Sequence, residues 1–128
     1  MADSTRDDLL RSCQSIADTL SRYLNGEYYC DDCGIWFKGD ECPECKMNRD
    51  DCDDLYEYIS DALDIKIVVD LRDYVYGCRI TMGWGGPNIY IDTEKEEVQG
   101  YWGTDEIHIP LSSEMCNRID ELISDMRC

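Results

Sequence analysis

Four cysteines in the first half of the chain have the spacing of a metal site. They form two pairs, Cys30-Asp-Asp-Cys33 and Cys42-Pro-Glu-Cys45, with eight residues between the pairs. Two residues between paired cysteines allow a tight turn that directs both sulfurs at one point, about 2.3 Å from a zinc ion. Gly34 after the first pair and Pro43 within the second suit the bends that such turns need. The sequence therefore predicts one zinc ion bound by Cys30, Cys33, Cys42 and Cys45.

Four thiolates complete the coordination shell of this zinc ion, which predicts a structural rather than a catalytic site. A catalytic zinc usually has three protein ligands and one open position. The segment from Glu27 to Lys46 has no sustained hydrophobic periodicity, so its structure depends on the metal. It resembles a compact zinc ribbon or rubredoxin-like knuckle. Many zinc ribbons bind nucleic acid through basic patches, but the acidic residues here argue against direct nucleic-acid binding: Asp31, Asp32, Asp40, Glu41 and Glu44.

The remaining reactive side chains form no recognisable catalytic set. Cys13, Cys78 and Cys116 lie at or beside apolar positions of predicted elements, which is typical of small buried residues. Cys52 follows the zinc segment, and we interpret it as a bystander rather than a fifth ligand. His108 is the only histidine, and no local sequence supports a nucleophilic pair with Cys78 or with a serine. We therefore expect that the protein is not an enzyme.

Negative charge dominates the composition. The 128 residues include 29 acidic and 12 basic side chains, for a formal net charge of −17. Such a chain repels nucleic acid and anionic membranes and is attracted to basic surfaces. The first eight residues are acidic where a signal peptide would be basic, and no stretch approaches the ~20 apolar residues of a membrane span. We expect a cytoplasmic protein with reduced thiols that binds a basic protein partner and no membrane.

An amphipathic helix is predicted at the start of the chain. Residues from Ser4 to Leu24 place their apolar side chains at three- and four-residue steps, on one face of a helix. Ser4 with Asp7 resembles a capping box, and Asn25-Gly26 supplies the stop.

The second half of the chain predicts a sheet followed by a last helix. From Ile65 the hydrophobic period changes to two, with short polar turns, which indicates antiparallel strands at 65–71, 74–82, 88–92 and 97–102 and an edge at 106–109. Ser112 or Ser113 then caps a helix. The order of elements predicts one α+β domain over residues 1–128, with a sheet of about four strands packed by helices and a zinc-ribbon insert at 27–46.

A second helix with divided faces is predicted from Asp50 to Asp64. At about 100° per residue its apolar residues cluster on one side and its carboxylates on the other. A helix of this length spans roughly 22 Å, so its carboxylates have nearly the charge spacing of a single DNA strand. Such a face is either a DNA mimic for a basic groove or the solvated side of a helix. The predicted partner-binding residues are Asp50, Asp53, Asp54, Glu57, Asp61 and Asp64, with Trp36 and Phe37 as aromatic anchors.

Two resemblances bear on function. Gly85-Gly86-Pro87-Asn88-Ile89-Tyr90-Ile91-Asp92-Thr93, followed by Gly100-Tyr101-Trp102, resembles a stretch in small proteins of phages and mobile elements. A small, acidic, zinc-containing chain is also similar to anti-CRISPR proteins that inhibit Cas9 of the type II-A class. Members of that family share no common fold or motif, so no site residue carries over. The resemblance implies a phage or prophage protein that binds the Cas9–guide RNA complex in a bacterial host cell and blocks target DNA binding.

Two classes of binding function therefore stay open. The first is an inhibitor of a nucleic-acid-handling complex, for which loss of the partner's DNA binding follows occupancy. The second is a zinc-ribbon adaptor or regulatory module, which assembles proteins and leaves the DNA binding of its partner unchanged.

Overall fold

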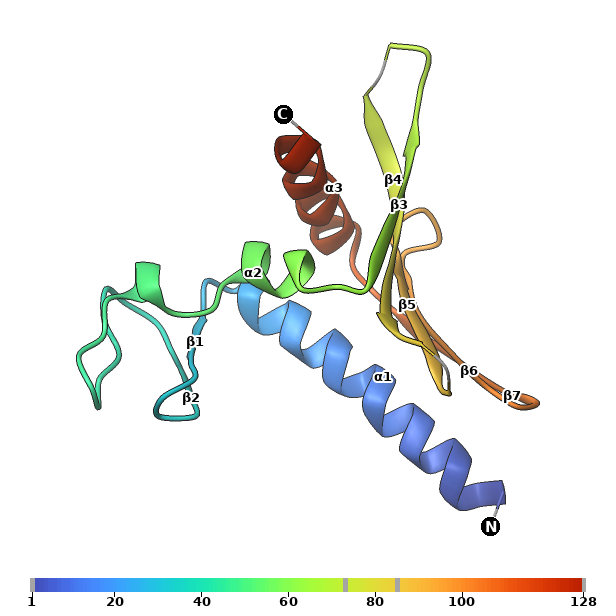
Figure 1. The fold of residues 1–128 in the computed structure, drawn as a ribbon, viewed down its shortest axis with the longest axis horizontal. Helices are drawn as coiled ribbons and strands as arrows, with labels where there is room; N and C mark the ends of the chain where they lie inside the picture. Colours follow the sequence, from blue (N-terminus) through green and yellow to red (C-terminus); the bar gives the residue numbers. More distant parts are fainter. Residues whose placement is uncertain (1, 73, 85, 128) are drawn as a thin grey trace.

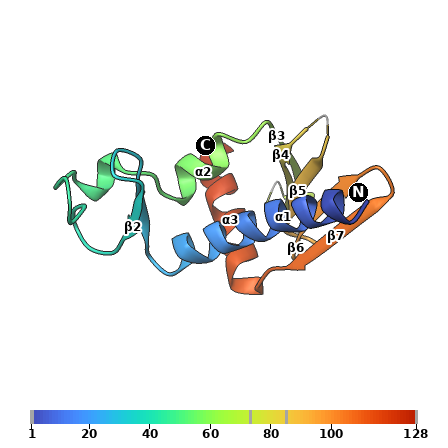
Figure 2. The same ribbon diagram turned by 90° about the horizontal axis from the view of Figure 1, so that it is seen from below.

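The chain forms a body with a small lobe at one end (Figures 1 and 2). The computed structural model describes residues 2–72, 74–84 and 86–127, with side chains described for residues 6–126 of these ranges. The body combines a five-stranded sheet with two long helices. We define the metal lobe as residues 27–53. It begins with a two-stranded hairpin, β1 (Tyr28–Cys30) and β2 (Ile35–Phe37).

The main sheet is an antiparallel meander whose strands follow the order of the sequence. The strands are β3 (Asp64–Val69), β4 (Val75–Gly83), β5 (Asn88–Asp92), β6 (Glu97–Trp102) and β7 (Asp105–Pro110). This confirms the predicted α+β class, and the predicted edge is a full fifth strand. The register aligns a row of the buried residues Ile80, Ile91 and Val98 with the half-buried Ile109. The neighbouring row, on the opposite face, contains Thr81, Tyr90, Gln99 and His108.

The first helix, α1 (Ala2–Leu24), packs on β6 and β7. It begins two residues earlier than predicted, so Ser4 lies inside the helix and not at its N-cap. The predicted stop is confirmed, because Gly26 has a φ of 85° and its N–H donates to the carbonyl of Tyr23. The N–H of Glu27 donates to the carbonyl of Arg22, which completes a Schellman motif.

The segment between the lobe and the sheet is not the single helix predicted for residues 50–64. It contains a 3-10 turn, η1 (Arg49–Asp51), and a six-residue helix, α2 (Leu55–Ser60). The helix is interrupted because Tyr29 and Asp53 exchange backbone hydrogen bonds of 3.1 and 2.9 Å, which ties residue 53 to β1. The carboxylate of Asp54 then accepts the N–H of Glu57 and begins α2 as its N-cap. The predicted DNA-like row of carboxylates along one helix is therefore wrong.

The last helix, α3 (Ser113–Arg127), packs on β4, on the same face of the sheet as α1 (Figure 2). The predicted cap is Ser112, whose hydroxyl oxygen accepts the N–H of Met115 at 3.1 Å. A polar contact also joins helix and sheet, because the hydroxyl of Thr93 donates to the carboxylate of Asp120 at 2.8 Å. The Cys78 thiol lies beside this pair, 3.6 Å from Asp120.

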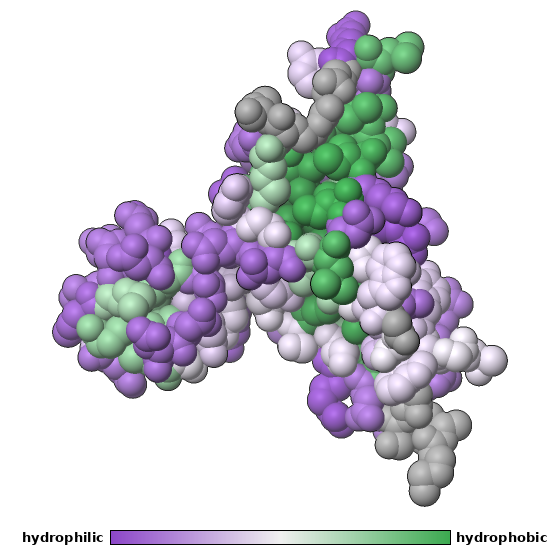
Figure 3. Space-filling view, viewed as in Figure 1, coloured by the Kyte–Doolittle hydropathy of each residue, from purple (hydrophilic) through white to green (hydrophobic). Residues whose placement is uncertain are grey.

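The β3–β4 hairpin extends beyond the other strands (Figure 1). Figure 3 shows an apolar surface in green over these two strands, whereas the metal lobe is mostly hydrophilic. The exposed apolar side chains of this part of the chain are Leu63, Ile67, Val69 and Leu71, with Tyr74 and Tyr76 on the returning side. β3 is an edge strand, so one side of its backbone has no neighbouring strand within the described sheet.

Candidate metal centre

Two turns of the same geometry present the four predicted cysteines. In the first, the N–H of Gly34 donates to the carbonyl of Cys30 at 2.7 Å. In the second, the N–H of Lys46 donates to the carbonyl of Cys42 at 2.9 Å. Gly34 and Lys46 have φ angles of 68° and 67°, so both turns end in a residue with left-handed backbone. The Cys-x-x-Cys spacing thus folds into two matched knuckles, as the sequence predicted.

The structure brings the four sulfurs of these knuckles together. The sulfurs of Cys30, Cys33, Cys42 and Cys45 all lie within 4.8 Å of one another, and those of Cys30 and Cys45 are 3.6 Å apart. Four sulfurs bound at about 2.3 Å to one tetrahedral zinc ion would be about 3.8 Å apart. The spacing therefore suits a single metal ion with four thiolate ligands.

The surroundings of the site favour metal binding at Cys42. The backbone N–H groups of Cys45 and Glu44 donate toward the Cys42 sulfur and lower the pKa of this thiol to about 7. A cysteine binds metal as the thiolate, so a lowered pKa aids ligation. Cys30 and Cys42 are fully buried, Cys33 is half-buried and Cys45 is exposed. One side of the cluster consequently faces solvent, from which a metal ion can enter.

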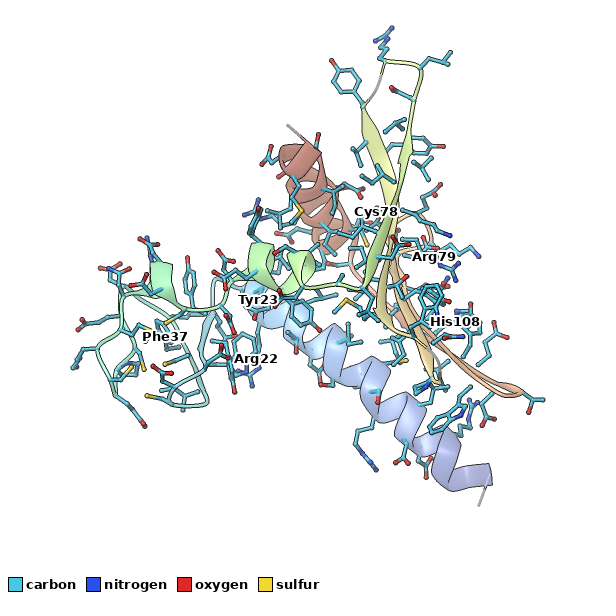
Figure 4. The ribbon with its side chains drawn as sticks, viewed as in Figure 1. Arg22, Tyr23, Phe37, Cys78, Arg79 and His108 are labelled. Carbon is cyan, nitrogen blue, oxygen red and sulfur yellow. The ribbon has the colours of Figure 1, made fainter. Side chains whose placement is uncertain are left out.

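A small core supports the knuckles from within the lobe. Phe37 and Cys52 are buried there beside Cys30 and Cys42. The Cys52 thiol donates to the carbonyl of Asn48 at 3.6 Å and lies outside the four-sulfur cluster, and burial raises its pKa to about 11. Phe37 is 6% exposed, so its ring is not available as the predicted contact for a partner. Figure 4 shows Phe37 in the lobe, beside several sulfur atoms.

The six carboxylates predicted to bind a partner lie on several elements. Asp50 is in η1, Asp53 is in the bridge to β1, and Asp54 and Glu57 begin α2. Asp61 is the C-cap of α2, and Asp64 is the first residue of β3. The carboxylates of Asp50, Glu57, Asp61 and Asp64 are exposed, whereas Asp53 and Asp54 are half-buried.

Trp36 occupies a different setting from Phe37. It is half-buried where β2 meets α1, and its ring centre lies 5.0 Å from those of both Tyr23 and Tyr29. The sequence interpretation named Trp36 but missed its tyrosine neighbours. The only available signal was composition, with nine tyrosines and a single phenylalanine.

Cys78 and His108 belong to separate clusters. Cys78 lies in the contact between β4 and α3, beside Thr93 and Asp120. His108 lies on the open face of the sheet, where its ring nitrogens are 2.8 Å from Glu97 and 2.7 Å from Glu106. Figure 4 labels both residues and shows them on different parts of the sheet. The structure does not bring them together as a nucleophilic pair.

Comparison with known proteins finds no matching family model, no matching curated protein and no matching solved structure. Among the helices that the structure describes, none has the length and apolar character required to cross a lipid bilayer. The functional conclusions below therefore depend on the site and on the distribution of charge.

Proposed function

We propose that the protein binds a basic surface of a protein partner through its metal lobe, and that one structural zinc ion holds this lobe in shape. The observation that carries the proposal is the concentration of charge. The 27 residues of the lobe include nine acidic and three basic side chains. Seven of these nine acidic residues are exposed, and Glu27 and Asp53 are half-buried. A patch of one sign attracts a surface of the opposite sign and speeds its association.

Zinc is the metal that best suits this donor set. Calcium and magnesium prefer oxygen ligands, whereas four thiolates in a tetrahedral arrangement are typical of structural zinc. With the knuckles closed on zinc, the thiolates and the ion together add to the negative charge of the lobe. The zinc site would therefore support the binding surface in two ways. It would stabilise the fold of the lobe, and its net negative charge would add to that of the surface.

Inhibition of a nucleic-acid-handling complex is the specific form of this proposal. The similarity to anti-CRISPR proteins favours the Cas9–guide RNA complex, which holds its guide–target duplex in a positively charged channel. A lobe at one end of the molecule suits entry into such a channel better than the flat face of a sheet does. The support is the acidic lobe itself, since residues 50–64 do not form a single helix with a row of carboxylates. The alternative is an adaptor that leaves DNA binding by its partner unchanged.

A charge-reversal variant of the lobe tests the proposal. We would replace three exposed lobe carboxylates with lysine, in the variant Glu41→Lys, Glu44→Lys and Asp51→Lys. Like charges that face a basic partner cost several kcal/mol, so we expect binding to the Cas9–guide RNA complex to weaken by about 100-fold or more. Biolayer interferometry measures the affinity, and a gel shift of target DNA measures inhibition.

A matched variant on the body controls for total charge. The change Asp8→Lys, Glu121→Lys and Asp125→Lys alters the net charge equally, at exposed positions of α1 and α3. Among the described residues, the only ion pairs that it removes are the surface pairs with Arg11 and Arg118, and such pairs contribute little to the stability of the fold. Equal weakening by both variants would contradict docking through the lobe. A complex that forms while the partner still binds DNA would favour the adaptor.

A further inference from the structure

A hollow of about 360 Å³ lies where the metal lobe meets α1 and α2. Four aromatic side chains and two carboxylates line it: Tyr23, Tyr29, Trp36, Tyr58, Asp31 and Asp53. Figure 4 shows Tyr23 at this junction. Tyr29, Asp31 and Trp36 come from the β1–β2 hairpin, and the tyrosines of the body come from α1 and α2. The volume is at the lower end of the range of small-ligand pockets.

The aromatic rings that line the hollow are inclined to one another and not stacked in parallel. The planes of Tyr23 and Trp36 meet at 66°, with ring centres 5.0 Å apart. Those of Tyr29 and Trp36 meet at 55°, and those of Tyr23 and Tyr58 at 48° with centres 5.6 Å apart. The face of an aromatic ring carries partial negative charge, so a hollow lined by four such rings can attract a cation.

The two carboxylates add negative charge to the same volume. Asp31 lies between two metal-site cysteines, and Asp53 is fixed by its backbone bridge to Tyr29. Burial raises the pKa of Asp53 to about 6, and its proximity to Asp31 and Glu57 contributes. Among the ion pairs of the described residues, none includes Asp31 or Asp53. A bound cation would relieve the repulsion between these carboxylates.

Arg22 lies beside this hollow but does not line it. Arg22 has its guanidinium carbon 5.2 Å from the centre of the Trp36 ring. However, it lines the neighbouring groove along α1 and pairs with Glu27 at 3.2 Å. The hollow itself is therefore open to a cation from outside the chain.

We propose that this pocket binds the alkylammonium group of a lysine side chain, N-methylated or not, that a basic protein partner presents. The identity of the partner rests on the proposed function. The chemical class of the ligand rests on the pocket alone. A compact ammonium suits walls inclined at 48–66°, whereas a planar guanidinium stacks best between parallel faces. The two carboxylates repel anions, and an uncharged ligand would not compensate the half-buried charge of Asp53.

Capped lysine derivatives test the pocket without a partner. The metal-loaded full chain would be titrated with Nα-acetyl-lysine methylamide, its Nε-trimethyl form and its neutral Nε-acetyl form, with detection by ¹H–¹⁵N NMR. We expect the two cations to shift the Trp36 indole signal and the backbone signals of Tyr23 and Asp53. The neutral form should produce no shift. Equal binding of the neutral form, or shifts spread evenly over acidic residues, would overturn the proposal.

Two variants and their controls identify the groups responsible. Asp53→Asn preserves the shape of the pocket, and Trp36→Leu removes its central ring. Each change should lower the affinity for the Nε-trimethyl derivative by about tenfold, which is in the range of cation–π and charge contributions. The matched changes Asp125→Asn and Trp84→Leu, at exposed positions outside the pocket, should leave affinity unchanged. Circular dichroism and metal content confirm the fold, and unchanged affinity in Asp53→Asn would contradict the inference.

Two further measurements separate this pocket from the proposed function. Choline that binds more tightly than either lysine derivative would contradict a protein side chain as the ligand. If Trp36→Leu still binds the Cas9–guide RNA complex normally, the pocket proposal fails and docking through the lobe stands. If lysine derivatives bind as expected but no basic partner does, the pocket stands and the proposed function fails.

Discussion

At the scale of single residues, backbone conformation decides whether the cysteines can meet. Gly34 and Lys46 both have left-handed φ angles directly after a Cys-x-x-Cys pair. Glycine adopts this conformation without a steric cost, whereas lysine has a Cβ that opposes it. The second knuckle is therefore held against a local preference by the hydrogen bonds of its own loop, such as that from Lys46 to Cys42. The spacing of the cysteines was readable in the sequence, but the left-handed lysine was not.

His108 makes stability depend on pH. Hydrogen bonds to Glu106 and Glu97 raise its pKa above the usual 6.5. Because the folded state binds this proton more tightly than the unfolded state, the stabilisation is complete below about pH 6.5 and is lost as pH rises through the folded pKa. We expect NMR titration to give a folded pKa above 6.5, and His108→Gln to remove this part of the pH dependence of urea unfolding. A folded pKa at or below 6.5 would show that the two carboxylates do not hold the proton.

At the scale of elements, periodicity predicted those parts of the chain whose contacts follow a regular pattern. β5 and β6 have the predicted bounds, and α1 and α3 have the predicted apolar faces. The prediction of one helix at 50–64 was wrong. The hydrophobic pattern of this segment favours a helix over most of its length and contains no signal for the interruption. What ends it is a contact distant in sequence, between Asp53 and Tyr29. The tyrosines of the pocket were missed for the same reason, since no local signal joins Tyr23 to Trp36.

Gly100 sets the closest approach of α1 to the sheet. A Cβ added there would lie 2.4 Å from the sulfur of Cys13 and 2.9 Å from a methyl carbon of Leu9. We expect Gly100→Ala to lower the free energy of unfolding by about 1–3 kcal/mol, the usual cost of overpacking. Urea denaturation measures the change. The double variant Gly100→Ala with Cys13→Ala should lose less free energy of unfolding than the sum of the losses in the two single variants. Strict additivity of the two losses would contradict a direct clash.

At the scale of the whole molecule, the body and the metal lobe have separate cores. The body core joins α1, α3 and the sheet through sixteen buried residues, among them Leu20, Ile80 and Ile119. The lobe core consists of Cys30, Phe37, Cys42 and Cys52. Three of its four members are thiols, so the apolar area buried in the lobe is small. We therefore expect the fold of the lobe to depend on a bound metal ion, and the fold of the body not to.

Metal removal should unfold the lobe alone. We expect about one zinc per chain by elemental analysis, and little in Cys42→Ser, because structural zinc supplies a large share of the folding free energy of such a lobe. Hydrogen exchange should then increase throughout residues 27–53 while β4–β6 stay protected. A zinc content unaffected by Cys42→Ser would refute the site. Protection lost equally in the sheet would contradict two separate cores.

The β3–β4 hairpin is expected to make self-association of the protein depend on salt. Residues 64–83, which form this apolar hairpin, have three acidic and three basic side chains. The hairpin is therefore electrically neutral in a protein of net charge −17. An unpaired edge strand is a template for another strand. Electrostatic repulsion between two molecules of this negative charge opposes contact between their β3–β4 hairpins. Screening shortens from about 8 Å at physiological ionic strength to about 3 Å in 1 M salt. We therefore expect high salt to promote association through this hairpin and, at the same time, to weaken binding to the proposed basic partner.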